Sequence, residues 1–300
     1  MNEESRDLIL RELPNLRRPY LVAAFGGWPD AGEVATGALR YLAAKLSARR
    51  LGTIDPDPYY DFGTSRPMAL IEGGAMQALR YPTSDLFYRQ DENAEHDFVM
   101  LLAGEPPHRW RRYTRTIMAL LRQFEVEMFV SLGSLFDTIP HTVEPRISGM
   151  ATSERLRARL RELNINLTDY QGPSSIQGAL LMACQEEGIE SVSLWGHAPM
   201  YVQTVANPKV SHGLLGRACA LLGIELNLDD LRAAGEYFDE TLSRLLSQNE
   251  GLRLYVHKLE EQYAGESATP EGELPDTARI VRDVEEFLRG EQKRWGEQDG

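Results

Sequence analysis

The chain has 300 residues, of which 42% are hydrophobic and 26% charged, and its formal net charge is −13. This composition is typical of a globular protein with a sizeable core, and the acidic balance argues against nonspecific nucleic-acid binding, which requires a basic surface. No run approaches the roughly 18 apolar residues of a membrane span. The charged N-terminus lacks the apolar stretch of a signal peptide, and Cys184 and Cys219 lie in apolar helical patterns. We therefore expect a cytoplasmic protein with two free thiols.

Residues 20–40 predict the first half of a βαβ unit. The apolar run 20–25 predicts a buried strand, Gly26 and Gly27 predict a turn, and the apolar positions from Val34 to Leu42 have helical spacing. Such units place the turn at the carboxyl edge of a parallel sheet, where open α/β folds bind their ligands.

The middle of the chain alternates between predicted strands and helices. Short strands are expected at 51–61, 66–72, 76–81 and 86–89, where the glycine pair 73–74 predicts an antiparallel meander at the margin of the main sheet. Core strands are expected at 97–103, at 128–132 closed by Gly133-Ser134, at 147–151, and at 191–195 ending at Gly196-His197. Helices are expected at 107–124, 153–163, 176–187 and 205–222. This alternation predicts the α/β class.

The C-terminal quarter has a different pattern. Residues 224–300 hold 19 Asp/Glu against 9 Lys/Arg, and two amphipathic segments, 231–245 and 252–263, predict an acidic αα-hairpin. The polar, Gly- and Pro-rich segment 264–276 predicts a flexible linker before a last helix from about residue 277. The predicted domains are therefore a core at 1–223, the hairpin at 224–263, the linker at 264–276, and a C-terminal helix and tail at 277–300.

The sequence contains none of the common catalytic signatures. It has no phosphate loop, H-E-x-x-H, paired C-x-x-C or G-x-S-x-G, and its six histidines show no helical ligand pairing. We therefore predict no cofactor, no metal site and no catalytic residue. The candidates that remain lie in segments after predicted strands and would form a ligand cleft. They are Gly26, Gly27, Trp28, Asp30, Gly32, Gly133, Ser134, Gly172, Ser174, Ser175, His197 and Tyr201.

Two interpretations of these residues remain open. Segment 26–32 either presents backbone N–H groups and the Asp30 carboxylate to a ligand at a helix N-terminus, or Asp30 caps that helix and the glycines permit tight packing. His197 is either an acid/base residue or a structural one.

Six segments in one order carry a family resemblance: AFGGWPDAG, IDPDPYYDF, GEPPHRW, SLGSLFDTIPHT, YQGPSSIQG and SLWGHAPMYV. Over about residues 18–263 the chain resembles the bacterial branch of the proteasome assembly chaperone 2 family, which older descriptions link to ATP-grasp enzymes. The resemblance implies a three-layer α/β/α core of the phosphorylase/hydrolase-like kind with a C-terminal helical hairpin. It also implies assembly into homo-oligomers, with a trimer as one option.

Two functions from different classes follow. The first is a non-catalytic assembly chaperone or scaffold, whose partners are further copies of the chain and a protein such as a proteasome subunit. Some relatives dock through a C-terminal hydrophobic-Tyr-x tail, which the final residues EQDG do not match. The second is an enzyme or binding protein for a small anionic ligand, a nucleotide or phosphate, at the carboxyl edge of the sheet. Neither hypothesis involves nucleic acid or a membrane as partner.

Overall fold

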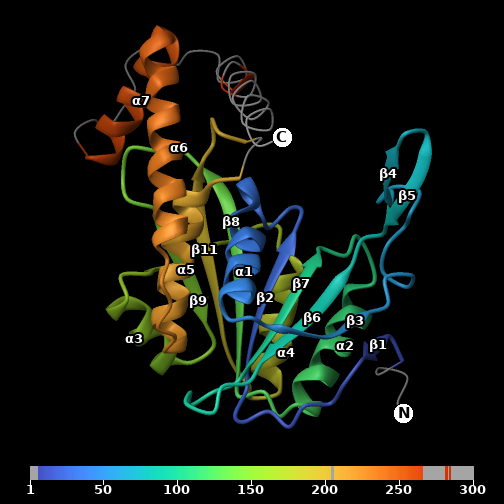
Figure 1. Cartoon of the computed structure of the whole chain (residues 1–300). Helices are drawn as coiled ribbons and strands as arrows, with labels where there is room; N and C mark the ends of the chain where they lie inside the picture. Colours follow the sequence, from blue (N-terminus) through green and yellow to red (C-terminus); the bar gives the residue numbers. More distant parts are fainter. Residues whose placement is uncertain (1–5, 204–205, 266–280, 283, 285–300) are drawn as a thin grey trace.

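The computed structural model describes residues 6–203, 206–265, 281–282 and 284, and its centre is a nine-stranded mixed sheet (Figure 1). The strand order is β1-β3-β6-β7-β2-β8-β11-β9-β10. The strands of this sheet are β1 (Leu8–Leu10), β2 (Tyr20–Gly26), β3 (Arg49–Ile54), β6 (Ser84–Arg89), β7 (Phe98–Gly104), β8 (Met128–Asp137), β9 (Ile147–Ala151), β10 (Asn166–Leu167) and β11 (Glu190–Pro199). The predicted α/β class is confirmed.

Four parallel strands form the middle of the sheet. In the order β7, β2, β8 and β11, each is paired in parallel with the next, while β6 pairs antiparallel with β7 and β9 pairs antiparallel with β11. Strand β2 is buried from Leu21 to Phe25 because helices cover both faces of the sheet. The carboxyl ends of these four strands therefore lie at one edge.

Two helical layers enclose the sheet. Alternate strand residues point to opposite faces, so Ala23 and Phe25 belong to one apolar cluster and Val22 and Ala24 to the other. The first cluster includes residues of α2 (Trp110–Gln123) and α4 (Ile176–Glu186). The second includes residues of α1 (Val34–Lys45), α3 (Glu154–Glu162) and α5 (Pro208–Leu222). This is the predicted three-layer arrangement.

The two cysteines lie in different layers. Cys184 of α4 packs in the first cluster and Cys219 of α5 in the second. Both are buried free thiols, as predicted, and burial raises the pKa of Cys184 to about 12 and that of Cys219 to about 11.

Strands β8 and β11 are longer than predicted. The sequence placed their ends at Gly133 and Gly196, but both strands continue for several residues beyond these glycines. A Cβ at Gly133 would lie 2.9 Å from two ring atoms of Trp195, and one at Gly196 would lie 2.8 Å from Val210. The glycines therefore make room for neighbouring side chains rather than forming turns.

Strand β3 is shorter than predicted, and β1 was not predicted. Pro56 accepts hydrogen bonds from the N–H groups of Tyr59 and Tyr60, so the segment after Ile54 is a turn and not a strand. The hydroxyl of Tyr59 then donates to Asp7, which directly precedes β1 and also accepts two hydrogen bonds from Arg112. These contacts attach the N-terminal segment to the edge of the sheet.

The predicted hairpin around Gly73 and Gly74 is confirmed, but it is separate from the main sheet. Strands β4 (Met68–Glu72) and β5 (Ala75–Arg80) form a two-stranded sheet of their own. Both glycines have positive φ, which permits the tight turn. We call residues 68–80 the arm, and in Figure 1 it projects from the body of the protein.

The predicted αα-hairpin consists of α6 (Asp229–Gln248) and α7 (Glu250–Tyr263). Helix α6 packs along α5, and both helices of the hairpin cover Tyr201 and Val202 in a third apolar cluster. Figure 1 shows the arm and α7 at the same end of the sheet. The predicted linker and final helix lie outside the described residues, apart from 264–265, 281–282 and 284. No helix in the described part of the chain is long and apolar enough to cross a membrane.

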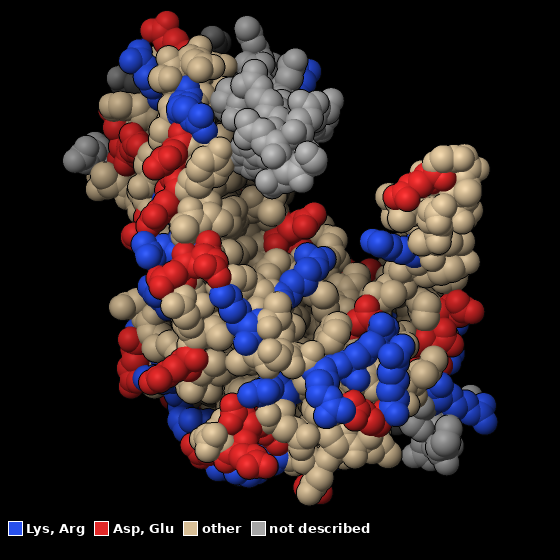
Figure 2. Space-filling model, in the orientation of Figure 1, with Lys and Arg blue, Asp and Glu red and all other residues tan. Residues whose placement is uncertain are grey.

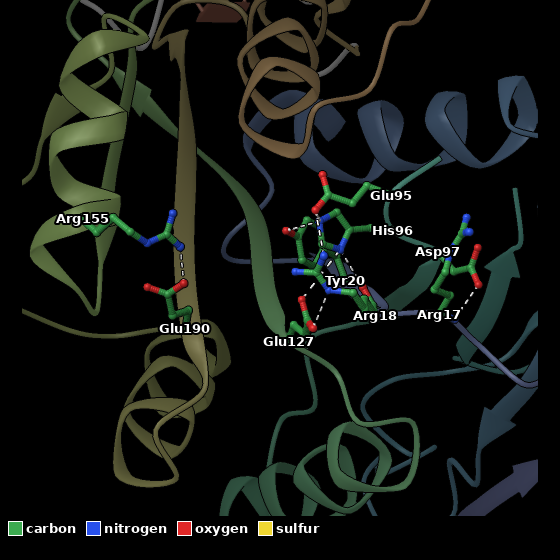
Figure 3. A network of polar contacts seen from close by, with 9 residues as sticks. All are labelled: Arg17, Arg18, Tyr20, Glu95, His96, Asp97, Glu127, Arg155 and Glu190. Carbon is green, nitrogen blue, oxygen red and sulfur yellow. Dashed lines mark hydrogen bonds and ion pairs between the residues drawn. The ribbon is translucent and has the colours of Figure 1, made fainter. Parts of the chain in front are cut away.

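Polar contacts occupy the amino edge of the sheet (Figure 3). Tyr20 stacks on His96 with ring centroids 3.8 Å apart, and its hydroxyl lies 2.8 Å from His96 Nε2. Arg18 forms ion pairs with Glu95 and Glu127. These contacts connect the segments that precede β2, β7 and β8. The amino edge is thus held by side chains from several elements.

Candidate functional site

A cavity of about 950 Å³ lies between helix α4 and the neighbouring strands β8, β11 and β9, close to the carboxyl edge of the sheet. Its walls come from the segment after β2, the end of β8, strands β9 and β11, and the chain between β10 and α4. The described residues that line it are Gly27, Trp28, Asp30, Ala31, Gly32, Glu33, Ser134, Leu135, Phe136, Ser148, Met150, Thr168, Tyr170, Gly172, Pro173, Ser174, Ser175, Gly178, Leu181, Ser193, Trp195 and Gln203.

One rim of the cavity forms because the chain leaves the sheet after β2. Strand β2 pairs with β8 as far as Ala24, opposite Leu132, and the next contact between the two segments is a bridge from Asp30 to Ser134. The intervening residues bulge outward through Gly27, whose φ of 105° is accessible mainly to glycine. Trp28 at this bulge is 62% exposed and lines the cavity. The bulge therefore opens space beside the sheet.

The Asp30 carboxylate is engaged by the helix that follows it. The N–H groups of Ala35 and Thr36 donate to Asp30 Oδ1 at 2.8 and 3.2 Å, and the Thr36 hydroxyl donates to Oδ2 at 2.5 Å. Burial raises the pKa of Asp30, although the hydrogen bonds from Thr36 and Ala35 oppose this shift. This geometry agrees with the interpretation of Asp30 as a helix cap.

A second carboxylate occupies the N-terminus of α4. Glu105, which follows β7, accepts a hydrogen bond of 2.8 Å from the N–H of Ile176. Burial raises its pKa, against the effect of this hydrogen bond. Both helix N-termini near the cavity thus already bind carboxylates of the chain itself. The described lining also contains Asp30 and Glu33 but no Lys or Arg, which makes it poorly suited to an anion.

Three polar side chains on three adjacent strands form a continuous chain of hydrogen bonds. Asp137 Oδ2 of β8 lies 2.7 Å from Nδ1 of His197 on β11, and Nε2 of the same imidazole lies 2.8 Å from Oγ of Ser148 on β9. The sheet register places them there, because Trp195 pairs with Ser148 and Pro199 pairs with Asp137. Ser148 lines the cavity, whereas His197 does not and instead lines a smaller pocket with Asn207 and Lys209.

The structure brings most of the predicted cleft residues together. Those that line the cavity are Gly27, Trp28, Asp30, Gly32, Ser134, Gly172, Ser174 and Ser175. Gly26 and Gly133 lie in β2 and β8 beside it. Tyr201 does not line it, because it is buried under α7 with its hydroxyl 2.6 Å from Nδ1 of His141. Whether any of these residues binds a ligand stays a prediction.

Sequence reasoning missed several cavity residues, including Ser148, Met150 and Trp195. The alternation of β9 was a usable signal, because Ser148 and Met150 must share one face of a strand. Asp137 lies in the part of β8 that continues beyond the predicted strand end at Gly133. In the described part of the chain, no three His, Cys, Asp or Glu side chains form a group that could hold a metal ion.

Comparison with known proteins identifies relatives of the whole fold. The PAC2 family model matches residues 24–246, whereas no curated protein matches the chain. A proteasome-assembly chaperone homologue from Mycobacterium tuberculosis is 33% identical, with 79% of this chain and 99% of that chain covered and a TM-score of 0.72.

Two further structures are similar. A PAC2 family protein from Streptomyces avermitilis is 32% identical, with 75% and 95% of the two chains covered and a TM-score of 0.68. An archaeal proteasome activator from Pyrococcus furiosus is 16% identical, with 79% and 97% covered and a TM-score of 0.64, and shares the fold. From the family match and the two bacterial relatives we conclude that the chain belongs to the PAC2 family.

Proposed function

We propose that the protein is an assembly-chaperone-like scaffold that acts as a homo-oligomer and binds a proteasome-related protein. Membership of the PAC2 family and similarity to a proteasome-assembly chaperone homologue support this role. Such a role depends on binding surfaces and requires no chemistry. We place the protein in the cytoplasm, as the sequence predicts. A nucleotide or phosphate site gains no support from a lining without Lys or Arg.

The arm is the observation that carries the oligomer proposal. Met68, Ile71 and Met76 are each at least 60% exposed, and Leu70 and Leu79 are 41% and 49% exposed. Most of the arm is free of charge in Figure 2, with Glu72 and Arg80 as the two charged residues in 68–80. A two-stranded ribbon is at best marginally stable alone. An apolar ribbon exposed on both faces therefore indicates a surface that another chain covers.

We propose a second copy of the chain as the partner that covers the arm. If the arm of one copy packs on a different surface of the next and the two copies do not exchange arms, the contact is heterologous, and a heterologous contact that closes forms a ring. Three copies form the smallest ring of this kind, which agrees with the expected trimer.

The oligomer is tested by sedimentation velocity and native mass spectrometry. We expect the wild-type chain to form a closed oligomer and the double variant Ile71→Lys/Met76→Lys to be monomeric, because buried unpaired lysines are costly at an interface. Gln77→Lys is the control, since it adds a lysine to the same arm at an already polar, exposed position. A wild-type chain that stays monomeric throughout contradicts the proposal.

The proteasome link needs a separate experiment. We expect purified proteasome α subunits to co-elute with the wild-type oligomer in size-exclusion chromatography, with the Gln77→Lys variant behaving in the same way. Elution of the two proteins as separate peaks, at concentrations where the oligomer is intact, contradicts this partner and leaves the homo-oligomer unaffected.

A further inference from the structure

The chain of hydrogen bonds from Asp137 through His197 to Ser148 suggests chemistry that the scaffold role does not use. We propose that Ser148 is a nucleophile that hydrolyses a neutral, apolar carboxylic ester bound in the cavity. The proposal is independent of the scaffold role and rests on two observations. These are the order of the three groups and the character of the space in front of Ser148.

The order of the groups suits nucleophile activation. The hydrogen bond from His197 lowers the pKa of Asp137, which also lies 3.8 Å from the Arg146 guanidinium, so this carboxylate is ionised at neutral pH. An ionised Asp137 accepts the Nδ1 proton of His197. Nε2 is then left as an acceptor, and the Ser148 hydroxyl donates to it. A serine, a histidine and a carboxylate in this sequence of hydrogen bonds form the arrangement found at nucleophilic serines on unrelated folds.

The cavity sets the class of substrate. Large apolar side chains line it, among them Phe136, Met150 and Trp195. Because its described lining has two carboxylates and no Lys or Arg, an anionic substrate would be repelled. The volume of about 950 Å³ is in the range of small-molecule sites. A neutral ester with an apolar acyl chain fits these properties.

Thr168 supplies a hydrogen-bond donor near the nucleophile. Its Oγ1 is buried without a hydrogen-bond partner in the described structure, and the residue lines the same cavity. The N–H of Thr168 donates to the Gly149 carbonyl, and Thr168 directly follows β10, in which Asn166 pairs with Ser148. We assign the Thr168 hydroxyl to the oxygen that becomes negative when the ester carbonyl is attacked.

The reaction consumes one water and yields an acid and an alcohol. Ser148 Oγ forms a bond to the carbonyl carbon while its proton passes to His197 Nε2, and the carbonyl electron pair moves onto oxygen. Collapse of this adduct breaks the bond to the alcohol oxygen, which takes the proton from Nε2. Water then attacks the acyl group on Ser148 and gives a proton to Nε2. The acid leaves as that proton returns to Ser148 Oγ.

The test uses the whole chain and two kinds of probe. A fluorophosphonate, from which an activated serine displaces fluoride, is followed by intact mass and peptide mapping. The p-nitrophenyl esters of acetate, butyrate and octanoate are followed by absorbance. We expect one adduct, on Ser148, and turnover that is faster for octanoate than for acetate.

Variants distinguish catalysis from a structural role. We expect Ser148→Ala to abolish both the adduct and turnover, and Asp137→Asn to slow both by about 100-fold or more because the imidazole adopts the wrong tautomer. Ser191→Ala is the matched control: this buried serine of β11 lies outside the cavity lining, and its removal should leave both rates unchanged. Ser148→Cys retains the size of the residue and serves if the alanine variant fails to fold.

Three results would overturn the proposal. One is a folded wild-type chain that forms no adduct, and another is an adduct on a residue other than Ser148. The third is labelling of Ser148 without turnover of any of the three esters. Loss of oligomers in the arm variants has no bearing on these outcomes.

Discussion

Asp30 shows how a single side chain fixes the entrance to the cavity. Its carboxylate holds the first turn of α1 through Ala35 and Thr36, and it lines the space that the bulge after β2 opens. We expect Asp30→Ala to lower the free energy of unfolding by about 2 kcal/mol, because buried N–H groups lose their acceptor. Urea denaturation measures this change. Glu33→Gln, which alters a neighbouring exposed carboxylate, is the control, and an equal effect of both would contradict the capping role.

Replacing glycine by alanine is predicted to have opposite effects on stability at two positions. Gly133→Ala places a Cβ 2.9 Å from Gln177 Oε1 and from the Trp195 ring. We therefore expect this substitution to lower the free energy of unfolding by about 1–3 kcal/mol. Gly37 lies inside α1, and a Cβ there meets only Ser211 Oγ, at an ordinary 3.8 Å. Gly37→Ala should therefore stabilise the protein by about 0.5–1 kcal/mol. Thermal unfolding of the two variants decides the sign of each effect.

The sequence predicted single residues well where a local rule applied. Asp30 was weighed as a helix cap because it directly precedes a helical pattern, and local hydrogen bonds explain its position. Ser148 could not be found in this way. Its partners are Asp137 and His197, and their meeting depends on the register of three strands that are distant in the sequence.

Among the elements of the fold, the loop after β8 is connected to Tyr201 and to helix α5 through His141. Its backbone N–H and its Nδ1 both contact the Tyr201 hydroxyl, and Lys209 donates to its carbonyl. Burial, with a smaller effect of Lys209, lowers the pKa of His141 to about 4. Because this pKa is depressed in the folded state, the stability linked to His141 is present above about pH 6.5 and is lost as the pH falls toward 4.

This linkage predicts a pH-dependent difference between variants. We expect the unfolding free energy of the wild type to fall by up to about 3 kcal/mol more than that of His141→Gln between pH 7 and pH 4. Urea denaturation at a series of pH values measures it. His257→Gln is the control, since its side chain is 67% exposed and should leave the wild-type pH dependence in place. Parallel curves for the wild type and His141→Gln would contradict the assignment.

Helices were predicted more accurately than strand ends. The αα-hairpin appeared where amphipathic spacing placed it, with Asn249 between the helices accepting a hydrogen bond from the N–H of Leu252. The predicted ends of β8 and β11 are wrong because glycine, which often signals a turn, lies inside both strands. In both strands the glycine has no side chain, and this leaves room for a side chain of another element to pack against the strand.

At the scale of the whole molecule, the arm is expected to couple folding to association. If a second copy covers it, the melting temperature of the wild type should rise between about 1 and about 100 µM protein, because mass action stabilises a folded oligomer. The melting temperature of the variant Ile71→Lys/Met76→Lys should not change over the same range of protein concentration. Differential scanning fluorimetry compares the two, and a concentration-independent wild-type transition would contradict the oligomer.

The α/β class could be predicted because buried strands and amphipathic helices alternate along the chain. The separation of the arm from the main sheet could not be predicted, although β4 and β5 were expected at the margin of that sheet. Local propensity specifies a strand, whereas its partner is decided by the tertiary structure.

The placement of Cys184 and Cys219 makes the two helical layers separately observable. One thiol lies beneath α4 and the other beneath α5, on opposite faces of the sheet, and both have raised pKa values. An alkylating reagent therefore reaches each sulfur only when its own layer opens. The rates of modification at the two positions, read by mass spectrometry in the native state, would report whether the layers detach together or one before the other.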